Sequence, residues 1–130
     1  MPEKEVNRIS MLGLAHVGDG VYELLVRSCL CQQGYSSVGQ LHRLTVARVK
    51  AQAQAAAAER ILPELSEQEL SVFKRGRNAK VNSVPHNAEL GQYHMATGLE
   101  ALFGWLYLQG KTERVNELFF LTAEDMTNAT

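Results

Sequence analysis

Apolar residues recur at helical spacing on two long segments of the chain. At about 100° per residue, one face of the first segment carries Leu12, Ala15, Tyr22 and Val26, and one face of the second carries Tyr93, Ala96, Phe103 and Tyr107. Elsewhere Ala, Leu, Glu, Gln and Arg dominate between the breaks, and only three prolines occur, at positions 2, 63 and 85. This pattern favours helices along the chain.

The breaks in the pattern set the expected helix boundaries. We predict helices at about residues 11–32, 36–44, 45–62, 66 to 73 or 74, 88–109 and 113–125. Gly34 and Pro63 would end the first and the third of these helices, and Gly110 separates the last two. Ser66 and Glu69 have the spacing of a capping box, which starts the fourth helix.

The composition fits one all-α domain. The chain has 130 residues, of which 45% are apolar, enough to bury a core without disulfides. No linker or repeat interrupts it, so we expect a single domain over residues 1–130 with a core at about 11–125. The polar N-terminus is unlike a secretory signal, and the longest apolar stretch, Leu99–Leu108, is too short to span a bilayer. Cys29 and Cys31 are interpreted as reduced thiols, and the protein as cytoplasmic, without a membrane partner.

A basic segment stands out against a net charge of −1. It contains Lys74, Arg75, Arg77 and Lys80, four cations within seven residues. Gly76 and residues 78–87 are expected to form a loop around Pro85. The net charge argues against a nonspecific nucleic-acid binder, whereas this local cluster could bind an anion. A solvated loop that offsets nearby acids explains the charges equally well, so both interpretations stay open.

Two carboxylates fall on the apolar faces described above. Asp19 lies on the first face and Glu100 on the second, where burying an unpaired carboxylate would cost several kcal/mol. Small neighbours would let two helices approach and bring both carboxylates to one ion: Gly18, Gly20, Gly98, Ala101 and Gly104. Mg²⁺ suits such a site because it needs only one or two carboxylates. The alternative is that arginines or backbone N–H groups bind each carboxylate in place of a metal. The spacing of these residues does not by itself identify a reaction.

Three segments carry a resemblance to a known family. Leu14–Glu23 (LAHVGDGVYE) resembles the signature helix of the ribonuclease III family, and Ala96–Gly104 (ATGLEALFG) resembles its second acidic motif. Lys74–Lys80 (KRGRNAK) is similar to the hallmark of the Mini-ribonuclease III branch, which consists of the catalytic domain without a double-stranded-RNA-binding domain. The resemblance extends over about residues 12–118, with all three motifs in order.

The resemblance implies a fold, an activity and partners. The fold would be the helical endonuclease domain of ribonuclease III, forming a homodimer whose interface makes a valley for an RNA duplex. The activity would be Mg²⁺-dependent hydrolysis of double-stranded RNA, with Mn²⁺ as a substitute ion, leaving 5′-phosphate and 3′-hydroxyl ends. The natural substrate would be the precursor of 23S ribosomal RNA, and a ribosomal protein could assist.

The resemblance also assigns the acidic residues. Asp19 and Glu100 match the two acids that act as catalytic metal ligands. Ala15 and Thr97 stand where longer family members carry two further acids, so this chain has fewer carboxylates to bind a metal. Glu23, one turn after Asp19, could lie near the metal, although a surface salt bridge is at least as good an explanation.

The assigned RNA-binding residues come from the basic segment. Lys74, Arg75, Arg77 and Lys80 are suited to phosphates, and Asn78 to a 2′-hydroxyl, since duplex RNA is recognised through its backbone. His86 stands where the family usually has a lysine. His16, close to Asp19 in the sequence, is interpreted as a structural histidine in preference to a metal ligand.

Two other functions compete with the nuclease. The first is a non-catalytic RNA-binding or ribosome-assembly dimer on the same fold, which would have lost the two acids. The second is a helical phosphohydrolase acting on nucleotides, which would usually bind its metal through His-Asp pairs. This chain has no His-Asp dipeptide and keeps both acids, which favours the nuclease.

Overall fold

The computed structural model describes residues 1–80 and 89–122, and every regular element in those residues is helical. The helices are α1 (Glu3–Val6), α2 (Met11–Gln32), α3 (Val38–Val49), α4 (Ala51–Ile61), α5 (Glu67–Arg77), α6 (Leu90–Leu108) and α7 (Thr112–Thr122), with one 3₁₀ turn, η1 (Leu62–Glu64). The all-α class predicted from the sequence is confirmed. No helix of the described residues combines the length and hydropathy needed to cross a bilayer.

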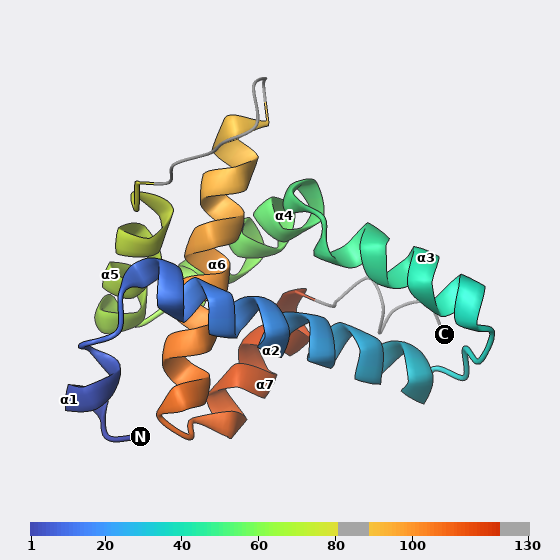
Figure 1. Ribbon diagram of the computed structural model, residues 1–130, viewed down its shortest axis with the longest axis horizontal. Helices are drawn as coiled ribbons and strands as arrows, with labels where there is room; N and C mark the ends of the chain where they lie inside the picture. Colours follow the sequence, from blue (N-terminus) through green and yellow to red (C-terminus); the bar gives the residue numbers. More distant parts are fainter. Residues whose placement is uncertain (81–88, 123–130) are drawn as a thin grey trace.

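Helix α6 is the centre of the fold, and α2, α4 and α5 pack around it (Figure 1). Between Ala96 and Leu106 every residue except Glu100 is buried, so this middle part of α6 is enclosed on all sides. A helix that is apolar around its whole circumference needs such neighbours. Glu100 is also the only charged residue in this stretch, and it is half-buried.

Several predicted helix ends are confirmed. α2 spans the predicted residues 11–32, and Gly34 after it has a φ of +97°, which side chains with a Cβ rarely adopt. Ser66 and Glu69 form the predicted capping box: Ser66 Oγ accepts from the Glu69 amide at 3.1 Å, and Glu69 Oε1 accepts from the Ser66 amide at 2.9 Å. α6 and α7 match the last two predicted helices, except that residues 88 and 123–125 lie outside the described residues.

The predicted boundary between Leu44 and Thr45 is wrong. α3 continues to Val49, and the chain turns at Lys50, whose extended backbone (φ −65°, ψ 155°) separates α3 from α4. Thr45 is buried and no glycine or proline stands beside it, so nothing interrupts the helix there. The Gln54 side chain stabilises the actual turn, because its Nε2 donates to the Val49 carbonyl oxygen at 2.9 Å.

The basic segment is helical as far as Arg77, which corrects the predicted loop. α5 continues through Gly76 because this glycine packs against α6: a Cβ there would lie 2.6 Å from the Cβ of Ala101. This packing offsets the intrinsic cost of glycine in a helix. Cations in the last turn also complement the negative end of the helix dipole. Residues 78–80 are not helical, as the predicted loop requires, and the rest of that loop, residues 81–87 with Pro85 and His86, lies outside the described residues.

The N-terminal segment adds a part of the core that the sequence analysis does not predict. Val6 of α1 is completely buried, and Asn7 Oδ1 accepts a hydrogen bond of 2.9 Å from the indole Nε1 of the buried Trp105. The packed core therefore begins before residue 11.

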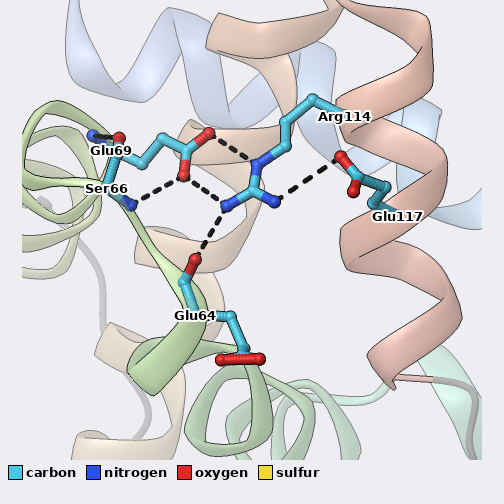
Figure 2. Close-up of polar contacts among 5 residues, drawn as sticks. All are labelled: Glu64, Ser66, Glu69, Arg114 and Glu117. Atoms are coloured by element: carbon cyan, nitrogen blue, oxygen red, sulfur yellow. Dashed lines mark hydrogen bonds and ion pairs between the residues drawn. The ribbon is translucent and has the colours of Figure 1, made fainter.

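Arg114 joins α7 to the start of α5 (Figure 2). Its guanidinium donates to both carboxylate oxygens of Glu69, at 2.7 and 2.8 Å, and to the Glu64 carbonyl oxygen at 2.8 Å. Glu117 lies 3.6 Å from the same guanidinium on its exposed side. The hydrogen bonds from Arg114 hold the pKa of the buried Glu69 below its usual range, and the bonds from Ser66 act in the same direction.

Arg114→Ala is expected to lower the free energy of unfolding by about 2 kcal/mol at neutral pH, because Glu69 would keep a buried charge without its partner. A carboxyl with a lowered pKa in the folded state stabilises the fold above its unfolded pKa of 4.5. That contribution is lost as the pH falls through the folded pKa, so the difference between variant and parent should shrink below pH 4.5 in urea titrations.

Arg27→Ala is the control for this prediction. Arg27 pairs with Glu23 on the surface of α2 at 2.8 Å, and both side chains are exposed to solvent. Such pairs contribute roughly 0–1 kcal/mol. Equal losses of stability in the two variants would contradict the role assigned to Arg114.

Candidate active site

Glycines let α2 and α6 cross in direct backbone contact. A Cβ at Gly18 would overlap the carbonyl oxygen of Glu100, and a Cβ at Gly104 would overlap the carbonyl oxygen of Leu14. Neither helix could therefore approach the other as closely with alanine at these positions. This crossing lies next to Asp19 on α2 and at Glu100 on α6, two residues far apart in the chain.

The crossing brings the two predicted carboxylates together. Asp19 is exposed and Glu100 is half-buried, and their side chains lie within hydrogen-bonding distance of each other. Burial raises the pKa of Glu100 to about 8, and the negative charge of Asp19 and the hydrogen bond between the two carboxyls act in the same direction. The neighbouring Gln54 amide acts in the opposite direction and lowers this pKa. Two acids in this arrangement favour a shared proton or a bound cation.

The prediction that both acids lie within buried stripes is only partly right. Asp19 is exposed, and so are Leu12 on its predicted stripe and Tyr107 on that of Glu100. The stripes are buried only where the other helices cover them, and Asp19 lies at the border of that area. The acid pair is therefore open to solvent on the Asp19 side.

The two carboxyls fit a hard divalent cation. Both offer oxygen ligands, and neither forms an ion pair with an arginine or lysine among the residues that the structure describes. Residues 1–80 and 89–122 contain no group of three or more His, Cys, Asp or Glu residues placed to hold a metal. Zn²⁺ usually needs such a group, whereas Mg²⁺ keeps several waters and needs one or two carboxylates.

Of three further residues singled out in the sequence, two are bonded to other partners and the third is exposed. Glu23 forms the surface salt bridge with Arg27, as in the alternative interpretation. Thr97 is buried, and its Oγ1 donates to the Tyr93 carbonyl oxygen of the same helix at 3.0 Å. His16 is an exposed residue of α2.

The predicted RNA-binding residues gather at the C-terminal end of α5. Lys74, Arg75 and Arg77 occupy its last turn, Asn78 is its C-cap, and Lys80 follows. Of these predicted residues, all but Arg77 are exposed, and Arg77 Nε donates to Asn78 Oδ1 at 3.2 Å. Three of them line an open hollow of about 350 Å³ together with other residues of the same helix: Glu67, Leu70, Ser71, Lys74, Arg75 and Asn78.

This basic end packs against the turn of α6 that carries Glu100. A Cβ at Gly76 would lie 2.6 Å from the Cβ of Ala101, the residue after Glu100, and 3.2 Å from the Cα of Gly98, two residues before it. Packing between α5 and α6 thus joins the helix that carries the cations to the helix that carries Glu100.

Comparison with known proteins connects this geometry to a family. The pattern of the Ribonuclease III domain matches residues 12–111, which include both carboxylates and the basic end of α5. The chain belongs to the ribonuclease III family. As a member of that family, it is an endoribonuclease.

Relatives of this ribonuclease narrow the assignment to one branch. Proteins named Mini-ribonuclease 3 from Symbiobacterium thermophilum and Desulfitobacterium hafniense are 45% and 50% identical to it over 113 and 107 residues. These matches cover 87% of this chain and 87% of the first relative, and 82% of this chain and 68% of the second. The crystal structure of a protein from Fusobacterium nucleatum superposes on this chain with a TM-score of 0.80. The match covers 89% of this chain and 93% of that one, and the two sequences are 31% identical. The resemblance to the Mini-ribonuclease III branch is confirmed.

Gln54 is the residue of this ribonuclease that sequence reasoning missed. It is 2% exposed and its side chain reaches Glu100. The alanine-rich sequence of α4 conceals it, because the glutamines there look like solvated positions of a packing helix. The available signal is the spacing: Gln54 shares a helical face with Ala58 and Ile61, both of them fully buried.

In the metal-free ribonuclease, Glu100→Gln is expected to raise the free energy of unfolding by about 2 kcal/mol near pH 9, and by much less near pH 5. The pKa of Glu100 is about 8 in the folded chain and 4.5 in the unfolded chain. Its stabilising contribution is therefore present below pH 4.5 and is lost as the pH rises through about 8. Urea titrations in EDTA at the two pH values would measure the effect. A difference that does not change with pH would contradict it.

Proposed function

We propose that this chain is a Mg²⁺-dependent endoribonuclease that cleaves double-stranded RNA, with Mn²⁺ able to replace Mg²⁺. The observation that carries the proposal is the meeting of Asp19 and Glu100 at the crossing of α2 and α6, open to solvent and without a cationic partner among the described residues. Asp19 and Glu100 are the proposed catalytic residues and metal ligands.

In this proposal, Asp19 and Glu100 bind the metal ion and orient it towards the RNA. Asp19, at the exposed border, would lie on the side from which the RNA approaches, and the half-buried Glu100 is held by the surrounding helices. When bound between them, Mg²⁺ would supply Lewis acidity for in-line attack of water on phosphorus and for departure of the 3′-oxygen. Glu100 must release its proton to bind the ion, because its pKa is raised by burial and by Asp19.

The basic end of α5 is the proposed site for the RNA backbone. Lys74, Arg75 and Lys80 are exposed there and are suited to phosphates, and Asn78 to a 2′-hydroxyl. Arg77 is half-buried and bonded to Asn78, so it would act partly by orienting that amide. Recognition of this kind depends on the shape of the duplex and not on its sequence.

The wider setting follows from the resemblance. We propose that the ribonuclease acts as a homodimer in the cytoplasm on the precursor of 23S ribosomal RNA, with a ribosomal protein able to assist cleavage. The names of its relatives support the activity, and the family resemblance supports the substrate and the dimer.

A substrate panel tests the proposed function. The protein would be incubated with duplex RNA, single-stranded RNA, duplex DNA and nucleotides, each with Mg²⁺ or with EDTA. We expect cleavage of duplex RNA only, and only with Mg²⁺, leaving 5′-phosphate ends. Binding of duplex RNA without cleavage would favour the non-catalytic dimer, and release of phosphate from nucleotides would favour the phosphohydrolase.

Arg75→Ala is expected to weaken duplex RNA binding about 5-fold near 0.1 M salt, through loss of a charge-assisted phosphate contact. It should also reduce the slope of log affinity against log salt by roughly one, the value for one contact. Binding titrations in EDTA at several salt concentrations would measure both quantities. Arg75→Lys is the control, because it keeps the charge and should keep the slope. An unchanged slope in Arg75→Ala would exclude this contact.

A further inference from the structure

Gln54 is a buried polar residue on the first turns of α4. It is 2% exposed, and its Nε2 donates to the carbonyl oxygen of Val49, the last residue of α3, at 2.9 Å. Its Oε1 is buried and accepts no hydrogen bond from the described residues. A buried acceptor without a donor costs about 1–3 kcal/mol. Such a group suggests a role other than stability.

The Gln54 side chain also lies close enough to the Glu100 carboxyl to lower its pKa, because α4 packs against α6. A side-chain amide has two N–H donors, so while one binds the Val49 carbonyl the other is available to the neighbouring Glu100 carboxyl. The Val49 carbonyl also fixes the orientation of the amide. Rotating the amide by half a turn would place Oε1 against the Val49 carbonyl oxygen, an unfavourable contact of two acceptors.

The contact has the chemistry needed to orient a metal ligand. An amide donor favours the ionised carboxylate, which is the form that binds a cation, and opposes the effects of burial and of Asp19 on Glu100. Residues that hydrogen-bond to ligating carboxylates fix their orientation and tune their affinity for metal. Gln54 is held at the turn between α3 and α4, so it joins a third part of the chain to the acid pair.

We propose that Gln54 is a positioning residue of the active site: its amide, anchored on the Val49 carbonyl, holds the Glu100 carboxylate in the orientation in which it binds the divalent cation together with Asp19. This inference rests on the proposed function, since it takes Asp19 and Glu100 as the metal ligands. The competing explanation is that Gln54 only closes the end of α3 by binding Val49.

Gln54→Met tests the proposal, because methionine has a similar shape and removes both the amide donor and the buried acceptor. The lost hydrogen bond and the relieved acceptor oppose each other, so we expect a Tm in EDTA close to that of the parent protein. Mn²⁺ binding, measured by electron paramagnetic resonance without RNA, should weaken about 10-fold. The Mg²⁺ concentration for half-maximal cleavage should rise by a similar factor. If Gln54→Met fails to fold, Gln54→Asn takes its place, because asparagine keeps the amide on a shorter side chain. Its Tm, its Mn²⁺ affinity and its Mg²⁺ requirement would be judged in the same way.

Gln52→Met is the matched control, since Gln52 is an exposed residue of the same helix. It should leave Tm, Mn²⁺ affinity and cleavage unchanged. A lower Tm in Gln54→Met with unchanged Mn²⁺ affinity would overturn the proposal and leave Gln54 as a cap of α3. If the parent protein bound Mn²⁺ no more tightly than Asp19→Asn, the proposed metal site itself would fail, and this inference with it.

Discussion

Replacing Asp19 with asparagine is expected to slow cleavage of duplex RNA by at least about 1,000-fold at saturating Mg²⁺. The reason is that a metal-binding carboxylate contributes several kcal/mol to the transition state, and about 1.4 kcal/mol corresponds to tenfold in rate. Asp19 is exposed, so loss of its charge should leave the fold unchanged or slightly more stable. Single-turnover cleavage and thermal unfolding would measure the two effects separately.

Glu23→Gln is the matched control for Asp19→Asn. It makes the same change from acid to amide one helical turn away, at a residue whose carboxylate is paired with Arg27. We expect cleavage within about twofold of the parent rate, since surface pairs contribute little. Near-normal turnover in Asp19→Asn would refute its role as a ligand, and equal losses in both variants would indicate a general effect of charge.

Gly18→Ala should lower the free energy of unfolding by about 3 kcal/mol or more. This loss is larger than the one expected for Arg114→Ala. Its Cβ would overlap the backbone carbonyl of Glu100, which cannot rotate away as a side chain can. The helices would have to separate, and the acid pair would separate with them. Urea unfolding and Mn²⁺ binding should therefore both show a large loss.

Gly20→Ala provides the comparison in the same helix. A Cβ at Gly20 would meet no atom within 4 Å, so the substitution should stabilise the fold by about 0.5–1 kcal/mol through its helix propensity. Opposite signs for the two alanine substitutions would show that the crossing, and not helix propensity, requires Gly18. A tolerated Gly18→Ala with intact metal binding would contradict the close approach of α2 and α6.

Local signals were sufficient for much of the fold. α2 has the predicted first and last residues, and α5 begins at a capping box that two side chains define. The turn at Lys50 and the continuation of α5 through Gly76 were not predictable in this way. Both depend on contacts with distant residues: a side chain that closes the end of α3, and a glycine that fits against α6.

At the candidate site too, local sequence signals predicted some features, and contacts with distant residues determine the others. Small residues around Asp19 and Glu100 indicated that two helices could meet there, and the structure brings these acids together. The exposure of Asp19 and the participation of Gln54 depend on which parts of each helix its neighbours cover. A periodic pattern gives the face of a helix but not the point at which a neighbouring helix stops covering it.

The enclosed position of α6 has a consequence for how the activity is acquired during folding. Glu100 reaches its partners only after α2 and α4 have docked on the same helix, so no short segment of the chain contains a partial catalytic centre. Amide hydrogens in the middle of α6 should exchange with solvent only when the whole protein opens. A newly made or partly degraded copy would therefore be inert towards RNA, and hydrolysis would begin only with the complete native structure.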